Sequence, residues 1–327
     1  MGGSTYVFFA LYLVLIIFGC TGNWMVVQVV RTTPSMHSVT NFLLTNLAIA
    51  DALTLGLSPF VWNTIFRAIK HPSGKLGDVV CMFLTGNCFI EVTINVSMLT
   101  LCILAIERFN ALVKPMIVGK RLTKNSVKFA ICGMWLFSIL FCIPSYTVFR
   151  YKDNGDGNCF KVWEYKWSKD NKGYVLSTIT LFFTAFLLLS YCYTKIIRGM
   201  YFTNTILATE NDATGKLGKD AGSRKKLMIM FLTATINFAV SYCFLLGLSF
   251  YGLLAKENSL EKQEKLLSTV QDVSWLLVFT SCSVNPLLYH LQSENYRRGF
   301  VKILRCGCGA NVNRLRRRPT SAEMYSL

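Results

Sequence analysis

Residues 6–30 read YVFFALYLVLIIFGCTGNWMVVQVV and contain no charged side chain. A helix needs roughly 20 predominantly apolar residues to cross the hydrocarbon of a bilayer. This stretch therefore predicts a membrane-spanning helix and not a core helix of a soluble domain. Residues 1–5 carry no Lys or Arg, so we expect no cleavable signal peptide and a short extracellular N-terminus without a ligand-binding module.

Six further apolar runs follow the first, and short polar segments separate them. Apolar residues make up 53% of the chain and charged residues only 16%, whereas soluble domains average about 25% charged. The pattern predicts an all-α membrane protein, with a seven-transmembrane helix bundle over residues 6–292. The seven runs are residues 6–30, 40–66, 79–110, 126–147, 174–199, 225–254 and 268–291.

A short amphipathic segment follows the last run, at residues 293–305. Tyr296 and Phe300 would share one side of a helix there, while Arg298 would lie on another side. This pattern predicts a helix that lies on the membrane surface. Residues 306–327 would form a basic cytoplasmic tail.

The positive charges indicate which side of the membrane each end of the chain occupies. If the N-terminus lies outside, the inner loops, their flanking helix ends and the tail hold 22 of the 34 Lys and Arg residues. Basic residues concentrate on the cytoplasmic side of membrane proteins, so we expect a plasma-membrane protein with a cytoplasmic C-terminus. The same rule accounts for the net charge of +17. Anionic membrane lipids are therefore expected partners, and nucleic acid is not.

Two short motifs carry polar residues into apolar runs. Glu107-Arg108-Phe109 ends the third run, where a snorkelling arginine at the membrane interface is the simplest interpretation. Asn285-Pro286-Leu287-Leu288-Tyr289 lies in the seventh run, where the proline frees a carbonyl and kinks the helix. Each motif alone is compatible with a purely structural role.

In their order along the chain, however, these motifs belong to a larger set. The set resembles the rhodopsin-like (class A) family of G-protein-coupled receptors, and it covers about residues 15–305. Its other members are Gly22-Asn23, the stretch Asn46-Leu47-Ala48-Ile49-Ala50-Asp51, Trp135, Pro144, Tyr193 and Phe238.

The resemblance implies a receptor that converts the binding of an extracellular ligand into activation of a heterotrimeric G protein, with no enzymatic activity. Arg108 would engage the G protein, and Glu107 would be its resting partner. The residues implied in coupling and activation are Glu107, Arg108, Tyr193, Phe238, Tyr242, Asn285, Pro286 and Tyr289. Arrestin is a further possible partner, which phosphorylated Thr320, Ser321 or Ser326 would recruit.

Asp51 places a carboxylate in mid-membrane, where a charge is costly and usually functional. The resemblance implies that Asn23, Ser97, Ser281 and Asn285 surround it. It also implies that these oxygen-bearing side chains hold a sodium ion that favours the inactive state. The alternative is a protonated Asp51 in a polar network. No other cofactor is expected.

The third run is longer than the family pattern. There are 27 steps from Cys81 to Arg108, two more than the family typically has. The excess predicts an added half turn or a bulge in the outer half of this helix.

The fifth and sixth runs also depart from the family. Ala185 stands where a proline is usual, and Tyr242 stands where a tryptophan is usual. Phe244 replaces the proline that normally kinks the sixth helix. Arg224 lies where an acid often pairs with Arg108, so we expect a less stable inactive state.

Ten of the 12 cysteines fall within apolar runs or on the cytoplasmic side, where thiols stay reduced. The resemblance implies a disulfide between the other two, Cys81 and Cys159. Cys306 and Cys308 follow the amphipathic segment, where palmitoylation and idle thiols are both open interpretations.

The ligand is less constrained by the sequence. Amine receptors carry an Asp where this chain has Ile90, although Glu91 lies next to it. Opsins carry a lysine where Phe279 stands, so retinal is not expected. The residues expected to face the ligand are Ile90, Glu91, Tyr242, Asp272, Trp275 and Phe279. The carboxylates among them could receive a cationic ligand group.

A peptide is the favoured ligand. Trp163, Tyr165 and Trp167 alternate with charged residues in the second outer loop. This alternation is compatible with a hairpin lid over a peptide site, and equally with a solvated loop.

Two alternative functions stay open. Tyr242 and Phe244 favour a non-coupling or constitutively active atypical receptor, such as a decoy, while an amine or another small molecule could replace the peptide. A transporter or channel is not favoured, because it would need more charged residues inside the membrane, or inverted repeats, and the sequence contains neither.

Overall fold

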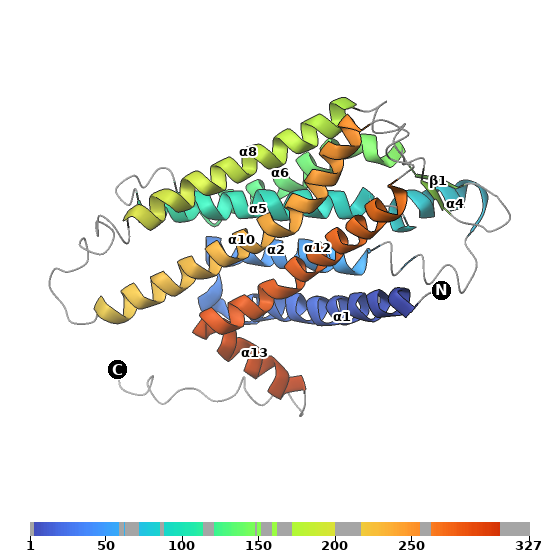
Figure 1. Cartoon of the computed structure of the whole chain (residues 1–327). Coiled ribbons are helices and arrows are strands. Elements are labelled where there is room, and N and C mark those ends of the chain that lie inside the picture. The colour runs from blue at the N-terminus through green and yellow to red at the C-terminus, as the bar shows by residue number, and fades with distance from the viewer. Residues whose placement is uncertain are drawn as a thin grey trace.

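The computed structural model describes residues 3–58, 62, 72–85, 88–113, 121–147, 149–151, 159–161, 172–199, 217–255 and 263–307. Over these ranges, seven long helical segments lie alongside one another as a bundle (Figure 1). They are α1 (Gly3–Thr32), α2 (Val39–Gly56), α4 (Gly74–Val80) with η2 (Cys81–Thr85) and α5 (Cys88–Leu112), α6 (Ser126–Phe141), α8 (Lys172–Ile197), α10 (Leu217–Leu254) and α12 (Glu264–Gln292). The predicted seven-helix bundle is confirmed.

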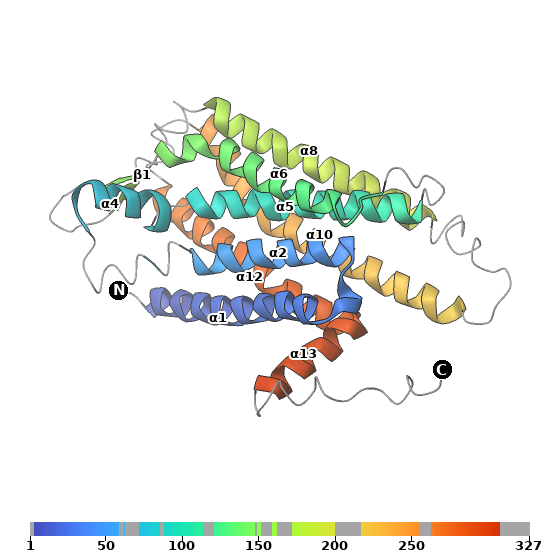
Figure 2. The ribbon, with the colours of Figure 1, turned by 180° about the vertical axis from the view of Figure 1, so that it is seen from behind.

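The smaller elements lie at the two ends of the bundle. The N-terminus and the strands β1 (Phe149–Tyr151) and β2 (Cys159–Lys161) lie at one end, and α13 (Glu294–Gly307) lies at the other (Figures 1 and 2). The two strands pair antiparallel, with Tyr151 opposite Cys159, and this pair is an addition to the expected all-α fold. Trp163, Tyr165 and Trp167 lie outside the described residues. The short helices η1 (Pro34–Met36) and η4 (Ile143–Thr147) complete the order.

Hydropathy explains why these segments fold as membrane helices. By length and composition alone, α1, α2, the stretch from α4 to α5, α8 and α10 are apolar enough to cross a membrane. α6 is an apolar helix of 16 residues. α12 carries more polar residues, and several of them, including Ser274, Ser281 and Asn285, are buried in the bundle.

Several helices begin or end at residues that differ from the ends of the apolar runs. α2 ends at Gly56, well before residue 66. α6 ends at Phe141, three residues before Pro144, and the 3-10 helix η4 begins at Ile143. Pro144 has no N–H to donate to the carbonyl of Leu140, so the α-helical bonding pattern does not continue through it. The third helical segment begins at Gly74, five residues earlier than its apolar run.

The N-terminal part of the third segment contains the predicted bulge. Residues Cys81–Thr85 form a π-helix, which is wider than an α-helix and places an extra residue in the turn. The expected irregularity in the outer half of this segment is therefore confirmed. The two extra residues between Cys81 and Arg108 were the signal in the sequence for this irregularity.

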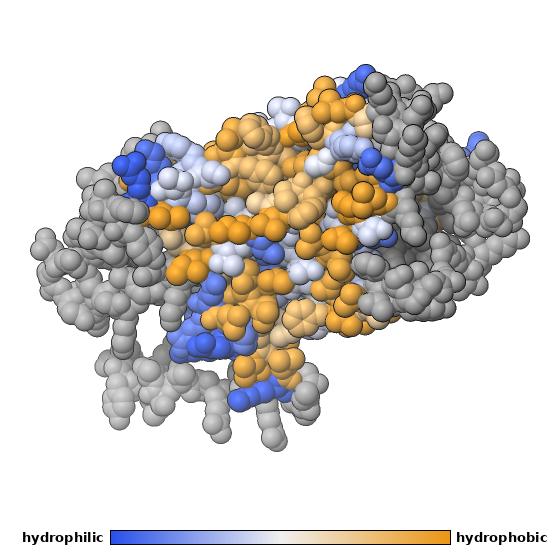
Figure 3. Space-filling view, viewed as in Figure 1, coloured by the Kyte–Doolittle hydropathy of each residue, from blue (hydrophilic) through white to orange (hydrophobic). Residues whose placement is uncertain are grey.

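The bundle is apolar on its outer surface as well as in most of its core, and a smaller set of polar side chains is buried between the helices. Large apolar side chains such as Ile17, Phe129 and Phe183 are exposed, and apolar residues cover much of the visible length of the helices (Figure 3). Asn23, Asp51 and other polar side chains are buried instead. Lipid tails are the surroundings that this distribution suits.

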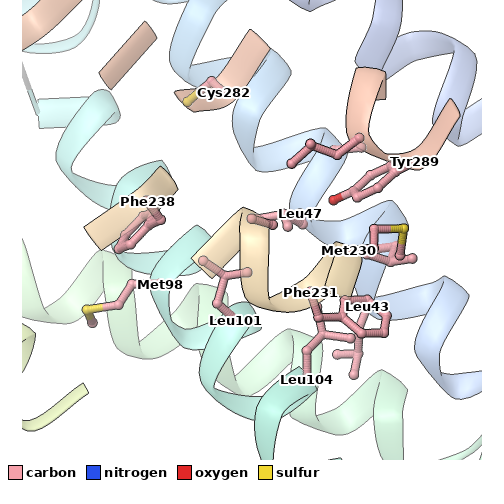
Figure 4. Packing of buried hydrophobic residues seen from close by; sticks show 14 of the residues in the cluster. Leu43, Leu47, Met98, Leu101, Leu104, Met230, Phe231, Phe238, Cys282 and Tyr289 are labelled. Carbon is pink, nitrogen blue, oxygen red and sulfur yellow. The ribbon is translucent and has the colours of Figure 1, made fainter. Parts of the chain in front are cut away.

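An apolar layer packs the half of the bundle nearer α13. Leu47, Leu101 and Phe231 are at most 3% exposed. Figure 4 shows these side chains from α2, α5 and α10 converging between the helices, with Tyr289 of α12 at the edge of the layer.

The amphipathic segment is confirmed as a helix, α13, which leaves the bundle at an angle after the extended residue Ser293 (Figure 1). Its apolar side packs against α1 and α12. A Cβ atom at Gly299 would lie 2.5 Å from Val29, and the Tyr289 and Tyr296 rings are 5.6 Å apart. The Tyr296 hydroxyl also donates to Asn41 Oδ1 of α2 at 3.3 Å.

Glycines allow α1 to approach α12 closely. A Cβ atom at Gly22 would lie 2.9 Å from the Pro286 side chain. One turn earlier, a Cβ atom at Gly19 would lie 2.5 Å from Ser283 Oγ. The absence of side chains at these two positions therefore determines how near α1 can lie to the proline kink.

We predict that Gly22→Leu lowers the thermal unfolding temperature of the detergent-solubilised protein, because overpacking a tight contact costs about 1–3 kcal/mol. Gly133→Leu is the matched control, since no atom lies within 4 Å of a Cβ atom at that position. Equal unfolding temperatures for the two variants would contradict the close contact.

Candidate functional site: a central polar network

The proline kink in α12 creates the first contact of the site. Pro286 has no N–H, so the carbonyl of Cys282 loses its partner within the helix. Asn23 of α1 supplies the missing donor, with its Nδ2 at 3.0 Å from that carbonyl and at 2.9 Å from the carbonyl of Gly19. α1 and α12 are thereby joined at the kink.

Asp51 lies at the meeting point of three helices. Its Oδ1 accepts a hydrogen bond from Ser97 Oγ of α5 at 2.9 Å, and its Oδ2 accepts one from Asn285 Nδ2 of α12 at 2.7 Å. Asp51 is 2% exposed. We call Asn23, Asp51, Ser97, Ser281 and Asn285 the central polar network.

Two oxygens of the central polar network have no partner. The side-chain carbonyls Asn23 Oδ1 and Asn285 Oδ1 are buried without a hydrogen bond. An unpaired buried acceptor is costly, and neutral oxygens beside a carboxylate are the ligands that a hard cation prefers. The donor set therefore fits the expected sodium ion.

Asn237 of α10 extends this network, and sequence reasoning missed it. Its Nδ2 donates to Ser281 Oγ at 3.1 Å, which connects α10 with the kinked helix. An Asn in an otherwise apolar stretch, next to Phe238, was the available signal.

A second polar contact joins α2, α5 and α6. Asn46 Nδ2 donates to Thr100 Oγ1 at 2.8 Å, and Trp135 Nε1 donates to Asn46 Oδ1 at 3.0 Å. Two residues of the sequence-predicted set, Asn46 and Trp135, are thus in direct contact.

Arg108 lies at the end of the bundle near α13, but it does not pair with Glu107 as expected. Its guanidinium donates to Thr40 Oγ1 of α2 and lies over the Phe231 ring, 5.7 Å from the centroid. Glu107 Oε2 instead accepts from the backbone N–H of Leu122 at 3.4 Å. Over the described residues, Arg108 has no ion pair with Glu107. The side chain of Arg224 lies outside the described part.

Aromatic residues link the central polar network to this end. Tyr242 is 3% exposed, and its ring lies 4.1 Å from that of Phe238. Both rings contact Phe182 of α8. Nearer α13, Thr235 Oγ1 donates to the hydroxyl of Tyr193 at 3.2 Å.

At the end near β1 and β2, the predicted ligand-facing residues separate into buried and exposed ones. Ile90 and Phe279 are 1% and 2% exposed, and Phe279 packs between Tyr12 and Trp275. Asp272 is exposed, and its backbone carbonyl accepts from the Tyr12 hydroxyl at 2.8 Å.

Cys81 is buried and disulfide-bonded. β1, which pairs with the strand that begins at Cys159, packs against η2. The side chain of Cys159 is not among those described, so its pairing with Cys81 stays a prediction. The Cys306 side chain and Cys308 also lie outside the described set.

Comparisons with known proteins agree with this architecture. A sequence profile of the family described as "7 transmembrane receptor (rhodopsin family)" matches residues 22–289. The Allatostatin-A receptor of Bombyx mori is 29% identical over 89% of this chain and 77% of its own length. The Tachykinin-like peptides receptor 86C of Drosophila melanogaster is 25% identical over 88% of this chain, which spans 56% of that receptor. The crystal structure of squid rhodopsin shares the fold, with a TM-score of 0.72 at 20% identity over 94% of this chain and 89% of that one.

We predict that Asn46→Leu lowers the unfolding temperature, because the substitution removes two hydrogen bonds between helices and leaves the Trp135 N–H without its partner. Such an unsatisfied group costs about 1–3 kcal/mol. Thr45→Val is the matched control on the same helix, since within the described part of the chain the Thr45 hydroxyl bonds only to the carbonyl of Asn41 in its own helix. If both variants unfold at the same temperature as the wild type, the contact between α2, α5 and α6 does not stabilise the protein.

Proposed function

Because the chain belongs to the rhodopsin family of seven-transmembrane receptors, we propose that it binds an extracellular peptide and in response activates a heterotrimeric G protein. The N-terminus and β strands would lie outside the cell, and α13 would lie at the cytoplasmic face of the plasma membrane. The distribution of Lys and Arg supports this orientation.

The observation that carries the proposal is a set of buried polar atoms near α13 that have no hydrogen-bond partner. Arg108 Nε, the Tyr289 hydroxyl and Gln292 Oε1 are buried without partners. Such groups are uncommon in a structure with a single stable arrangement, because each is costly. A second packing of α5, α10 and α12, or a bound G protein, would give them partners. The site therefore suits a switch better than a static scaffold.

The similarity to named receptors supports a peptide ligand. The Bombyx and Drosophila relatives cover about nine-tenths of this chain. The name of the Drosophila receptor states that it receives tachykinin-like peptides. The exposed outer end of α12, with Asp272 and part of Trp275 accessible, offers a surface on which such a ligand could begin to dock.

We predict that Arg108→Ala lowers G-protein dissociation in cells that carry dissociation sensors. The comparison is made first without ligand and then across a peptide library, with Arg31→Ala as the control. Arg31 lies exposed in the last turn of α1, at the same end of the bundle. Its loss changes the net charge equally without touching the buried groups.

Equal signals for the wild type and Arg108→Ala under all conditions would contradict G-protein coupling. They would instead support the alternative, a non-coupling decoy. α10 gives that alternative some structural basis, because it is a continuous helix without a proline from Leu217 to Leu254.

The sodium ion is part of the same proposal. Asp51, with the unpaired oxygens of Asn23 and Asn285, would hold the ion, and Ser97 and Ser281 would complete the oxygen set. The ion would supply the positive charge that a buried carboxylate otherwise lacks. It would stabilise the packing in which α1, α2, α5 and α12 converge.

We predict that replacing choline chloride by sodium chloride at equal ionic strength raises the unfolding temperature of the wild type but not of Asp51→Asn. A ligand at ten times its Kd stabilises the folded state by about 1.4 kcal/mol. A sodium effect of equal size in both proteins would exclude Asp51 as a ligand and favour the protonated polar network.

A further inference from the structure

The segment before α6 combines an exposed hydroxyl group with several basic residues. Its sequence reads Lys120-Arg121-Leu122-Thr123-Lys124. Arg121, Thr123 and Lys124 are exposed, and residues 121–123 lie outside any helix or strand. Neither the central polar network nor the proposed ligand site makes use of the Thr123 hydroxyl.

The Thr123 hydroxyl has a defined position, because it belongs to a capping box on the turn that leads into α6. It accepts a hydrogen bond from the N–H of Ser126 at 3.1 Å, while the Thr123 N–H donates to Ser126 Oγ at 2.8 Å. The Thr123 carbonyl accepts from the N–H of Val127 at 3.0 Å, so helical hydrogen bonding begins at this residue. The hydroxyl is therefore both held in place and accessible from solvent.

The same segment contacts the residues implied in coupling. The N–H of Leu122, directly before Thr123, donates to Glu107 Oε2 at 3.4 Å. Arg121 interacts electrostatically with Arg108. A change of charge at Thr123 would therefore alter the electrostatic surroundings of both Glu107 and Arg108.

We propose that Thr123 is a phosphorylation site for a Ser/Thr protein kinase that recognises basic residues before its acceptor, and that the phosphate lowers G-protein coupling. The second part rests on the proposed receptor function. Lys120 and Arg121 stand three and two positions before the acceptor. Kinases select their substrates by such charge patterns.

The modification uses ATP as the co-substrate. A bond forms between Thr123 Oγ1 and the γ-phosphorus of ATP, and the bond from that phosphorus to the β,γ-bridging oxygen breaks. ADP leaves, and the hydroxyl proton is released. The added group carries a charge of about −1.5 to −2 at pH 7.

This charge has opposite effects on its two sides. Toward α6 it is favourable, because negative charge is stabilised near a helix N-terminus and Lys124 lies beside it. Toward α5 it repels the Glu107 carboxylate, which the neighbouring Leu122 N–H now holds. We expect this repulsion to separate the segment from the end of α5 at which the G protein would engage.

The first measurement tests the site itself. The purified full-length protein in detergent is incubated with Mg-ATP and the catalytic subunit of cyclic-AMP-dependent protein kinase, and phosphate is located residue by residue with mass spectrometry. We expect phosphate on Thr123. Arg121→Gln should slow its incorporation at least about tenfold, the effect of losing one hydrogen bond to a charged group. Lys128→Gln is the matched control, since it removes the same charge from an exposed position in α6 outside the recognition sequence.

The second measurement separates charge from helix capping. Asn and Asp are both good N-cap residues, so Thr123→Asn and Thr123→Asp keep the cap and differ by one negative charge. G-protein dissociation is compared in cells at equal surface expression, without ligand and with the peptide library. We expect a signal several-fold lower for Thr123→Asp than for Thr123→Asn.

Each result decides one part of the proposal. Wild-type protein without phosphate on Thr123, or equal rates for the wild type and Arg121→Gln, would overturn the site. Equal G-protein dissociation in Thr123→Asn and Thr123→Asp would overturn the regulatory role. A wild type that activates no G protein would refute the proposed receptor function and the regulatory role together, while the mass-spectrometric result decides the phosphorylation site by itself.

Discussion

The hydrocarbon of a bilayer offers no hydrogen bonds, so each polar group within the bundle has to find its partner inside the protein. The carbonyl of Cys282, which Pro286 leaves without a helical donor, meets this constraint through Asn23. Asp51 meets it through Ser97 and Asn285. These few contacts join α1, α2, α5 and α12 through polar groups at the kink.

The same constraint connects the two ends of the molecule. Gly19 and Gly22 let α1 reach the kink, and Asn237 connects the kinked helix to α10. Farther along, Arg108 and Tyr289 retain unfilled hydrogen-bonding groups. These buried polar contacts would transmit the change in helix packing that the proposed receptor function requires. Over the described residues, no group of three or more His, Cys or acidic side chains could hold a metal ion.

Sequence reasoning predicted the features that depend on local composition or spacing. The apolar runs predicted the seven helices, and the residue spacing after Cys81 predicted an added half turn or a bulge, which is a π-helix in the structure. It did not predict features that depend on which side chains meet across the bundle. The interaction of Arg108 with Thr40, and the separation of Glu107 from it, follow from the approach of α2 and α5 in three dimensions. Asn237 was missed because a single amide in an apolar run reveals no partner until α10 and α12 are placed together.

The most direct test of the buried polar network is a double-mutant cycle that exchanges Asp51 and Asn285. Unfolding of the purified protein is measured for Asp51→Asn, Asn285→Asp and the double variant, which restores one carboxylate and one amide in exchanged positions. If the pair acts as a unit, the double variant should be more stable than the sum of the single effects by about 0.5–3 kcal/mol. Strictly additive effects would contradict a network centred on this contact.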